Sequence, residues 1–559
     1  MEKPPALPSR EEEARACLDS SAFGPGVRAV LVAGLAVLLF AGIGAEVVLR
    51  ADAARDRWSA WRALWPSEVR WTSVRSVADA WALLPSPSGT RAAEKALEEH
   101  AALANCVRPR VQQALTAWAG EGNTQVRVAR RRGALFFQKD CEFVEGPAFL
   151  ETSWADRGRA AGRSVDSVGA VLDFSKQLET RGIRLVVLPA PVKPMVEGHW
   201  MSGEAPGLRV NRSYAKWLEI LRAQGVDVLD VAGDLVKRER DTGAGQYLLT
   251  DTHWRPESMQ AVAARVAEHV RGVANLREEP ASGAPVREMP REVFAHGDTL
   301  ALLGLPEQQS LFQKEPVKIA PVSFGGRVWR GDPSAEVLVL GDSFTNIYSL
   351  GALGWGESAG FAEQLSVELG RPVDVLARNS DGAFATRAML QRELAAGRDR
   401  LRGKRVVVWE FAARELAFGD WRFLSMTLGK PGPTEFFEPK NGRSVRVQGT
   451  VGEVASIPQP GSVPYREHIV SVRLLDVQVE GQPAENGRQA LVYSWSMRER
   501  ELTAVARMRL GDRVEFQLRA WEEVSGELEK FQRSEFADPT LVAEPVAWGD
   551  WVGSVESGR

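Results

Sequence analysis

The sequence is short of several residue types and motifs, and each shortage excludes a class of function. Lys and Arg number 70 against 73 Asp and Glu, giving a net charge of -3 over 559 residues. A nucleic-acid binder would carry a basic surplus or stripe, so we do not expect this protein to bind nucleic acid. The chain has no C-x-x-C, no H-E-x-x-H, no Walker A and no complete G-x-G-x-x-G motif. We therefore predict neither a cofactor nor a metal.

Long apolar runs are rare, and the longest lies near the N-terminus. Residues 29–45 carry no charge, and Arg28 and Arg50 lie on either side of the run. The apolar segment 29–49 has about the ~20 residues that cross a bilayer, and it lacks the polar face of a core helix. The sequence predicts a single-pass anchor there, after a tail over 1–28. A cleaved signal peptide is the alternative, but its apolar region would be only ~7–15 residues long.

Cysteine is scarce, with three in the chain. Cys17 precedes the apolar run, whereas Cys106 and Cys141 follow it. The latter two would form a disulfide if that side of the membrane is oxidising. Two unpaired buried thiols are the alternative.

The segment after the anchor, 51–130, is predicted as a helical lead-in, because its apolar residues recur at helical spacing. Beyond it, continuous apolar runs alternate with helical patterns. Runs apolar on both faces are typical of a parallel sheet that helices cover on both sides. The pattern predicts a doubly wound α/β domain over 131–428. The expected strands are 184–192, 226–233, 336–343, 373–377 and 405–411, and the expected helices include 160–180, 213–225, 256–273 and 361–370.

The C-terminal part of the chain has a different period. Residues 429–442 are rich in Pro and Gly and indicate a linker. Short alternating strands with regular turns follow, over 443–559. They predict a small OB-like β-barrel, a fold that binds oligosaccharides as well as oligonucleotides.

The stretch VLVLGDSFTN ends an apolar run on Gly-Asp-Ser. Ligands of open α/β sheets bind beyond the carboxyl ends of the strands. Ser343 lies at such an end, and Asn379 lies past the end of the next expected strand. Ser343 is therefore a candidate nucleophile, which needs a base and a group that orients the base. An ordinary turn is the alternative, because Asp and Ser bond to nearby backbone.

Only six histidines are available as that base. His253 lies in YLLTDTHWRPESM, two residues after Asp251. In an extended loop this spacing directs both side chains to one face, so Asp251 would hold the imidazole in its productive tautomer. A capping or packing histidine is the alternative. Metal binding by this pair is not expected, since no third ligand is evident.

GDSFT and DTHW, on an α/β domain behind an anchor, resemble the SGNH hydrolase-like O-acetyltransferases of exopolysaccharide systems, such as the periplasmic alginate O-acetyltransferases. GALFFQKDCEF, LPAPVKPMVEG and GDTLALLGLP add to the likeness, which covers roughly 130–425. The resemblance implies that Ser343 is the nucleophile, His253 the general base and Asp251 its orienter. Ordinary SGNH hydrolases run Ser first and Asp-x-x-His last. The order here is Asp, His, Ser, which looks like a circular permutation.

An acyl-transfer site also needs hydrogen-bond donors for the oxyanion. The backbone N–H of Ser343 is one candidate, and NSDGAFATR supplies Asn379 and Gly382. Arg387 is expected to bind an anionic sugar or to orient this loop. Two further candidate binding residues are Tyr348 and Arg414, and for Arg414 a structural ion pair is the alternative.

The resemblance predicts a polysaccharide O-acetyltransferase with an acetyl-serine intermediate, in the bacterial inner membrane with its catalytic domain in the periplasm. It implies a polysaccharide acceptor and an acetyl supply through a multi-pass membrane O-acyltransferase. The first alternative is an esterase that removes acetyl groups by the same chemistry. The second is a polysaccharide-binding scaffold without catalysis.

Overall fold

The computed structural model describes most of the chain from residue 102 to residue 555, and four isolated residues before it, at 27, 30, 32 and 34. The predicted anchor, 29–49, and the lead-in up to residue 101 otherwise lie outside the described residues. No helix among those that are described is long and apolar enough to span a membrane. The gaps after residue 102 are 130–132, 275, 277–282, 380–381, 396, 430–435, 459, 461–462, 464, 484–486, 509–510, 537–540 and 542–543.

A five-stranded sheet forms the centre of the α/β domain, and all of its strand pairs are parallel. Every residue of its strands β10 and β12 is buried, as expected where helices cover both faces. The predicted parallel sheet of an α/β domain is confirmed. In spatial order its strands are β11 (Asp374–Ala377), β10 (Val337–Gly341), β12 (Val406–Ala412), β3 (Arg184–Ala190) and β4 (Asp227–Val228).

The strand order is a circular permutation of a common one. With β10 counted as the first strand and β3 and β4 moved behind β12, the spatial order reads 2-1-3-4-5. That is the flavodoxin-like order, whose ligand site lies between its first and third strands at their carboxyl ends. In this chain the corresponding strands are β10 and β12. The topology therefore directs attention to the end of β10.

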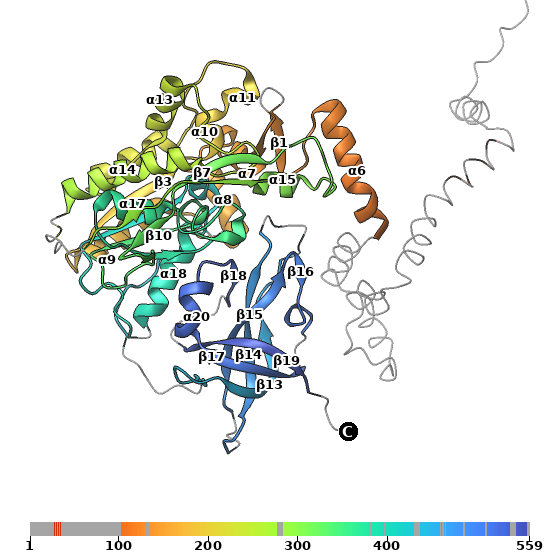
Figure 1. The fold of residues 1–559 in the computed structure, drawn as a ribbon, viewed down its shortest axis with the longest axis vertical. Helices are drawn as coiled ribbons and strands as arrows, with labels where there is room; N and C mark the ends of the chain where they lie inside the picture. The colour runs from red at the N-terminus through yellow and green to blue at the C-terminus, as the bar shows by residue number, and fades with distance from the viewer. Residues whose placement is uncertain are drawn as a thin grey trace, which may run out of the picture. The chain divides into compact units, whose positions relative to one another are not determined.

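Helices lie on both sides of the sheet (Figure 1). Phe174 of α9 packs edge-on against Trp409 of β12, and Arg387 of α18 lies over the same indole, so α9 and α18 cover one face. Figure 1 shows α14 and α17 on the other side. The main helices are α9 (Ser167–Glu179), α12 (Tyr214–Ala223), α14 (Pro256–Val273), α17 (Phe361–Leu369) and α18 (Gly382–Ala395).

Shorter helices and strands lie outside the central sheet, in the segments that connect its strands. A helix, a two-stranded hairpin and a further helix precede β3. They are α6 (Ala102–Ala119), β1 (Val126–Ala129), β2 (Ala134–Phe137) and α7 (Gln138–Glu145). The others are α8 (Thr152–Ala160), α10 (Lys193–Glu197), α11 (His199–Ser202), α13 (Ala232–Thr242), β5 (Val286–Arg287), β6 (Arg291–Ala295), α15 (Asp298–Leu303), β7 (Glu315–Ile319), β8 (Val322–Phe324), β9 (Arg327–Val328), α16 (Ser343–Asn346) and α19 (Glu415–Phe418).

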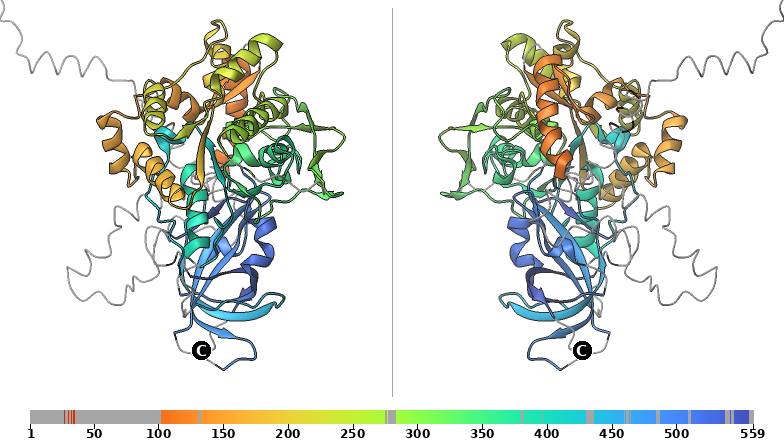
Figure 2. Two further views of the ribbon diagram at one scale, coloured as in Figure 1. Left: turned by 90° about the vertical axis from the view of Figure 1, so that its left-hand side faces the viewer. Right: turned by 90° about the vertical axis from the view of Figure 1, so that its right-hand side faces the viewer.

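The C-terminal region forms a closed five-stranded barrel, drawn in blue in Figure 2. Its order is β13-β14-β15-β19-β17, and β17 pairs back onto β13. The predicted small barrel is confirmed; its last strand, β19, falls in a stretch where the sequence pattern predicts no strand. The strands are β13 (Val445–Val454), β14 (His468–Val479), β15 (Ala490–Arg498), β17 (Arg513–Ala520) and β19 (Val546–Ser554), with β16 (Glu501–Leu502), α20 (Trp521–Leu528) and β18 (Arg533–Ser534) beside them.

Candidate active site

The nucleophile turn, which we define as residues 341–346, begins where β10 ends. Ser343 is the first residue of α16 and is only half-buried, although β10 before it is wholly buried. A Cβ atom at Gly341 would lie 2.1 Å from Oγ1 of Thr345, so only glycine permits this tight strand-to-helix turn. The turn holds a serine hydroxyl at the carboxyl edge of the sheet, as predicted.

Asp342 shapes this turn. Its Oδ1 accepts from the backbone N–H of Phe344 at 2.8 Å, and its Oδ2 accepts from that of Ala412 at 2.8 Å. Glu410 of β12 accepts from the backbone N–H of Asp342 at 3.0 Å and from the Thr345 hydroxyl at 2.8 Å. Burial, and then the charge of Asp342, raise the pKa of Glu410 well above its usual value. Burial thus favours the neutral form of the Glu410 carboxyl group, which ties the turn to the neighbouring strand.

The base hairpin, which we define as residues 246–255, carries the two other predicted residues. Its arms meet through a bridge between Tyr247 and Trp254. Nδ1 of His253 lies 2.6 Å from Oδ1 of Asp251, and both side chains are buried. Oδ2 of Asp251 accepts from the indole of Trp355 at 2.9 Å and from the N–H of Asp298 at 3.0 Å. The carboxylate that orients the imidazole is therefore itself held from two sides.

Electrostatics favour a charged carboxylate beside a basic imidazole. Burial opposes this charge, but His253 and the donors around Asp251 lower the pKa of Asp251. Burial likewise acts to lower the pKa of His253, but the charge and hydrogen bond of Asp251 raise it above its usual value. Asp298, the first residue of α15, accepts from the N–H of Thr252 on the base hairpin at 2.9 Å, and burial and the charge of Asp251 raise the pKa of Asp298 to about 6.

A buried lysine holds one arm of the base hairpin. Nζ of Lys193 donates to the backbone carbonyls of Leu135, Leu248 and Leu249 at 2.6–2.8 Å. Burial lowers the pKa of Lys193. These bonds join α10, β2 and the base hairpin, so three separate segments fix the path of the loop.

The base hairpin and the nucleophile turn pack directly together. The ring of His253 lies 4.8 Å from that of Phe344, centroid to centroid, and the indole of Trp254 donates to the carbonyl of Phe344 at 3.2 Å. The hydroxyl of Tyr348 donates to the carbonyl of Trp254 at 2.7 Å. Nε2 of His253 is buried and has no hydrogen-bond partner among the described residues. The ring nitrogen that a general base would use is therefore available, beside the residue that follows Ser343.

The predicted oxyanion residues lie at the end of β11. The backbone N–H of Arg378 bonds to the carbonyl of Gly341, and Oδ1 of Asn379 accepts from the amide of Asn346 at 2.9 Å. This leaves the amide nitrogen of Asn379 as a donor beside the nucleophile turn. Gly382 begins α18 with φ +43°, and a Cβ there would lie 2.3 Å from the carboxyl group of Glu415. Gly382 thus serves the close packing of α18, and the structure gives no donor role to it.

Three of the predicted binding residues, Arg387, Tyr348 and Arg414, contact other parts of the protein. Arg387 is fully buried over Trp409, and burial lowers its pKa to about 10. Tyr348 is also fully buried, with its hydroxyl on the hairpin backbone. Both side chains are thus buried, and the binding roles predicted for the two residues stay predictions. Arg414 forms an ion pair with the buried carboxylate of Asp140 at 3.0 Å. This agrees with the alternative stated for Arg414, a structural ion pair.

Cys141 is a free, buried thiol among the described residues, and its disulfide with Cys106 stays a prediction. Burial raises the pKa of Cys141 to about 12, so it is unreactive. The side chain of Cys106 lies outside the described residues.

One group in the described part of the chain has the geometry of a metal site, and it belongs to the base hairpin. Ligand atoms of Asp251, His253 and Asp298 lie within 4.8 Å of one another. However, Nδ1 of His253 is bonded to Asp251, and Oδ2 of Asp298 accepts from the Thr252 hydroxyl at 2.6 Å. Hydrogen bonds thus already use these atoms and account for the cluster.

Sequence reasoning missed four residues that support the site: Glu410, Trp355, Asp298 and Lys193. Glu410 gave a usable signal, since it is a single carboxylate in a strand that is otherwise apolar. Asp298 and Lys193 lie within motifs that carried the family resemblance, but no pattern assigned them a role. Trp355 gave no signal, because nothing local to it points to a carboxylate 104 positions away.

Comparison with known proteins agrees with the predicted resemblance. Residues 149–413 match the family model "SGNH hydrolase-like domain, acetyltransferase AlgX". A curated relative, the "Probable alginate O-acetylase AlgJ" of Pseudomonas aeruginosa, is 28% identical over 210 residues, or 36% of this chain. The chain spans about half the length of that relative, 48%.

Three solved structures of similar proteins are compared with this chain. The O-acetyltransferase domain of Pseudomonas putida AlgJ is 20% identical, with a TM-score of 0.39, and the match covers 51% of this chain and 90% of that one. Pseudomonas aeruginosa AlgX is 16% identical, with a TM-score of 0.35 and coverage of 64% and 82%. Bacillus cereus PatB1 is 11% identical, with a TM-score of 0.30 and coverage of 53% and 99%.

Proposed function

Because residues 149–413 are homologous to the SGNH hydrolase-like domain of the acetyltransferase AlgX, we propose that this protein is a polysaccharide O-acetyltransferase. The family match and the curated O-acetylase relative support acetylation of a polysaccharide in broad terms. One observation carries the chemical part of the proposal. The base hairpin holds a buried His–Asp pair against the turn that carries Ser343, with Nε2 of the histidine unpartnered among the described residues.

In the first half of the reaction, Oγ of Ser343 attacks the carbonyl carbon of an acetyl donor while Nε2 of His253 takes the hydroxyl proton. The negative charge that develops on the carbonyl oxygen is stabilised by the N–H of Ser343 and the amide of Asn379. The bond to the leaving group then breaks, and His253 returns the proton to that group. The product is an acetyl ester on Ser343.

In the second half, a sugar hydroxyl gives its proton to His253 and attacks the acetyl-serine. The Ser343 oxygen leaves and recovers the proton, so the enzyme returns to its starting state. Throughout, Asp251 keeps the Nδ1–H of His253 in place and stabilises the imidazolium. Trp355 and Asp298 in turn hold Asp251.

The surroundings of the reaction are part of the proposal. The apolar segment 29–49 would anchor the chain in the bacterial inner membrane with the catalytic domain in the periplasm. The resemblance to exopolysaccharide acetyltransferases supports an acetyl supply through a multi-pass membrane O-acyltransferase. The C-terminal barrel, which we interpret as OB-like, would hold the glycan, since barrels of that kind bind oligosaccharides.

Transfer of acetyl groups to a glycan tests the proposal. The full-length protein is incubated with an activated acetyl ester and oligosaccharide acceptors, and acetylated sugar and free acetate are measured. We expect acetylated sugar from the wild type and from Ser334→Ala, a control at an exposed serine outside the site, but none from Ser343→Ala. Acetate released from an acetylated glycan, without any transfer, would favour the esterase. Glycan binding with no acetyl turnover at all would favour the scaffold.

A further inference from the structure

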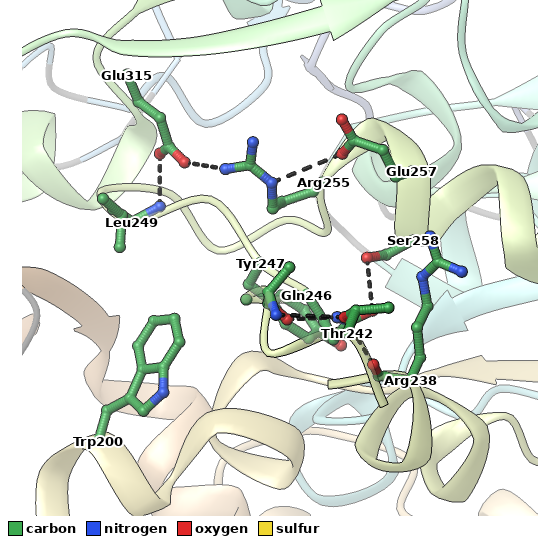
Figure 3. A pocket seen from close by; sticks show the side chains of 12 residues that line it. Trp200, Arg238, Thr242, Gln246, Tyr247, Leu249, Arg255, Glu257, Ser258 and Glu315 are labelled. Carbon is green, nitrogen blue, oxygen red and sulfur yellow. Dashed lines mark hydrogen bonds and ion pairs between the residues drawn. The ribbon is translucent and has the colours of Figure 1, made fainter. Parts of the chain in front are cut away.

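The base hairpin is held by charged groups of the same α/β domain (Figure 3). Arg255 lies between Glu315 and Glu257 and pairs with both carboxylates. Glu315 also accepts a hydrogen bond from the N–H of Leu249 at 2.7 Å. Because Leu249 and Arg255 belong to opposite arms of the hairpin, the carboxylate of Glu315 joins the two arms of the loop that carries His253.

The segment that supplies Asn379, a proposed oxyanion donor, has a similar arrangement, but its carboxylate comes from the C-terminal barrel region. Residues 112–559 form one compact unit. Within it, Glu535 follows β18, which pairs with the barrel strand β14. Nη1 of Arg378, the residue before Asn379, lies 3.5 Å from Oε1 of Glu535, and Nη2 of Arg378 donates to the backbone carbonyl of Arg533. The side chain adjacent to the oxyanion amide therefore bonds to the barrel region.

Glu535 accepts hydrogen bonds from both domains. Arg392 of α18 donates from Nη1 to Oε1 at 2.9 Å and from Nη2 to Oε2 at 3.0 Å. Nε of Arg533 and the hydroxyl of Tyr493 donate to Oε1 at 2.8 and 2.7 Å. The side chain of Glu535 is only 16% exposed. Burial opposes its charge, but Arg392, Arg378 and Arg533 lower its pKa well below the usual value. Glu535 is therefore a carboxylate at neutral pH that three guanidinium groups share.

Arg378 and Asn379 also contact the nucleophile turn directly. The N–H of Arg378 bonds to the carbonyl of Gly341 at 3.0 Å, and Oδ1 of Asn379 accepts from the amide of Asn346 at 2.9 Å. Both Arg378 and Asn379 are buried, so a shift of either would leave a buried polar group unpaired. Because the two residues are neighbours in the chain, the position of the oxyanion amide relative to Ser343 depends on what holds the guanidinium of Arg378.

We propose that Glu535 is a positioning residue for acetyl transfer: it fixes Arg378 and thereby the side-chain amide of Asn379 that stabilises the oxyanion. Glu535 itself does not touch the substrate. The barrel region would thus complete the oxyanion site of the α/β domain, in addition to holding glycan. This role rests on the proposed function, because Asn379 acts as an oxyanion donor only in acyl transfer. The hold of Glu535 on Arg378 does not rest on it.

Turnover of a small activated acetyl ester by the full-length protein tests the proposal. Glu535→Gln keeps the shape of the side chain but removes the charge that the arginines share. We expect kcat to fall about 10- to 100-fold, the effect of misplacing a catalytic group by about 1 Å, and KM for the ester to stay within about twofold. Glu522→Gln is the matched control. Glu522 of α20 pairs with Arg398 of the α/β domain at 3.4 Å, and its loss should leave kcat unchanged.

A double-mutant cycle distinguishes positioning from general support of the fold. Asn379→Ala removes the donor itself and should lower kcat about 10²- to 10³-fold. If Glu535 acts through Asn379, adding Glu535→Gln to Asn379→Ala should lower kcat by less than about twofold further. A merely structural loss would lower kcat by the same factor in both backgrounds. Arg378→Lys, which keeps the charge, should retain more activity than Arg378→Gln, and this pair tests the same link if Glu535→Gln fails to fold in thermal unfolding.

Hydrogen–deuterium exchange measures the hold on Arg378 without any turnover. We expect the amide of Arg378, which bonds to Gly341, to exchange faster in Glu535→Gln than in the wild type, and at the wild-type rate in Glu522→Gln. Equal exchange in Glu535→Gln and the wild type would overturn the proposal, as would equal kcat or equal factors in the two backgrounds. Faster exchange without ester turnover by the wild type would refute the proposed function, and the positioning role with it, but not the hold on Arg378.

Discussion

The nucleophile turn and the base hairpin build two halves of one site by different means. Ser343 is positioned by local chain geometry, because a buried strand ends in a glycine and the next residue caps a short helix. His253 is positioned by distant contacts, through Asp251 to Trp355 and Asp298 and through Lys193 to the hairpin backbone. The first half is held by its own strand and by the neighbouring strand β12, through Glu410 and the N–H of Ala412, whereas the second depends on segments spread from β2 to the loop after α16.

This difference determines how each half should respond to mutation. Because several residues support His253, single substitutions around it should lower activity by different amounts. The largest loss is expected at Asp251, which contacts the imidazole. Because few groups hold the backbone of the nucleophile turn, a substitution at any one of them should lower both stability and activity. The predictions below run from the largest expected effect to the smallest.

Asp251→Asn should lower kcat by about 10³- to 10⁴-fold. The asparagine amide keeps the shape of the carboxylate but favours the wrong tautomer of His253. Acetyl-ester turnover measures the loss. A loss below tenfold would mean that Asp251 does not orient the base.

The pH dependence of kcat/KM should follow His253. A general base must be neutral, so kcat/KM should fall tenfold per pH unit as pH drops below the raised pKa of His253. In Asp251→Asn the acid limb should move to lower pH, because burial then lowers this pKa without the opposing charge. An unmoved limb in the variant would contradict the assignment of the base.

Glu410→Ala should destabilise the nucleophile turn and slow the reaction about 10- to 100-fold. It leaves the buried N–H of Asp342 without its acceptor, which costs about 1–3 kcal/mol of unfolding free energy. Glu410→Gln should recover most of both, since the side-chain oxygen of glutamine can accept the same two hydrogen bonds. Thermal unfolding and kcat are measured for both variants. Equal losses in Glu410→Ala and Glu410→Gln would show that Glu410 acts through its charge.

Trp355→Phe should lower kcat by about tenfold, because Asp251 loses one of its donors but keeps the other, the N–H of Asp298. The KM for a small acetyl ester should stay within about twofold. A loss as large as that of Asp251→Asn would contradict distributed support.

Arg387→Met should have the smallest effect on function. The guanidinium is fully buried against Trp409, on the face of the sheet covered by α9 and α18. The KM for glycan should therefore stay within about twofold of wild type. A tenfold rise in KM would support Arg387 as a binding residue.

The contrast also explains how far sequence reasoning reached. The strands, the parallel sheet, the barrel and the positions of Ser343, His253 and Asp251 depend on local patterns, namely apolar runs and a spacing of two residues. Trp355, Asp298 and Lys193 depend on tertiary contacts that no local pattern encodes. The burial of Arg387 and Tyr348 could not be predicted, because nearness to a motif along the chain does not reveal which face of the sheet a helix covers, or how deeply a side chain is buried.

Intact-mass spectrometry of the full-length protein after incubation with an activated acetyl ester tests the central claim most directly. The account predicts a gain of one acetyl group in the wild type, mapped to Ser343, with none in Ser343→Ala and a greatly slowed gain in His253→Ala. No adduct and no ester turnover in the wild type, or an adduct that persists in Ser343→Ala, would contradict it.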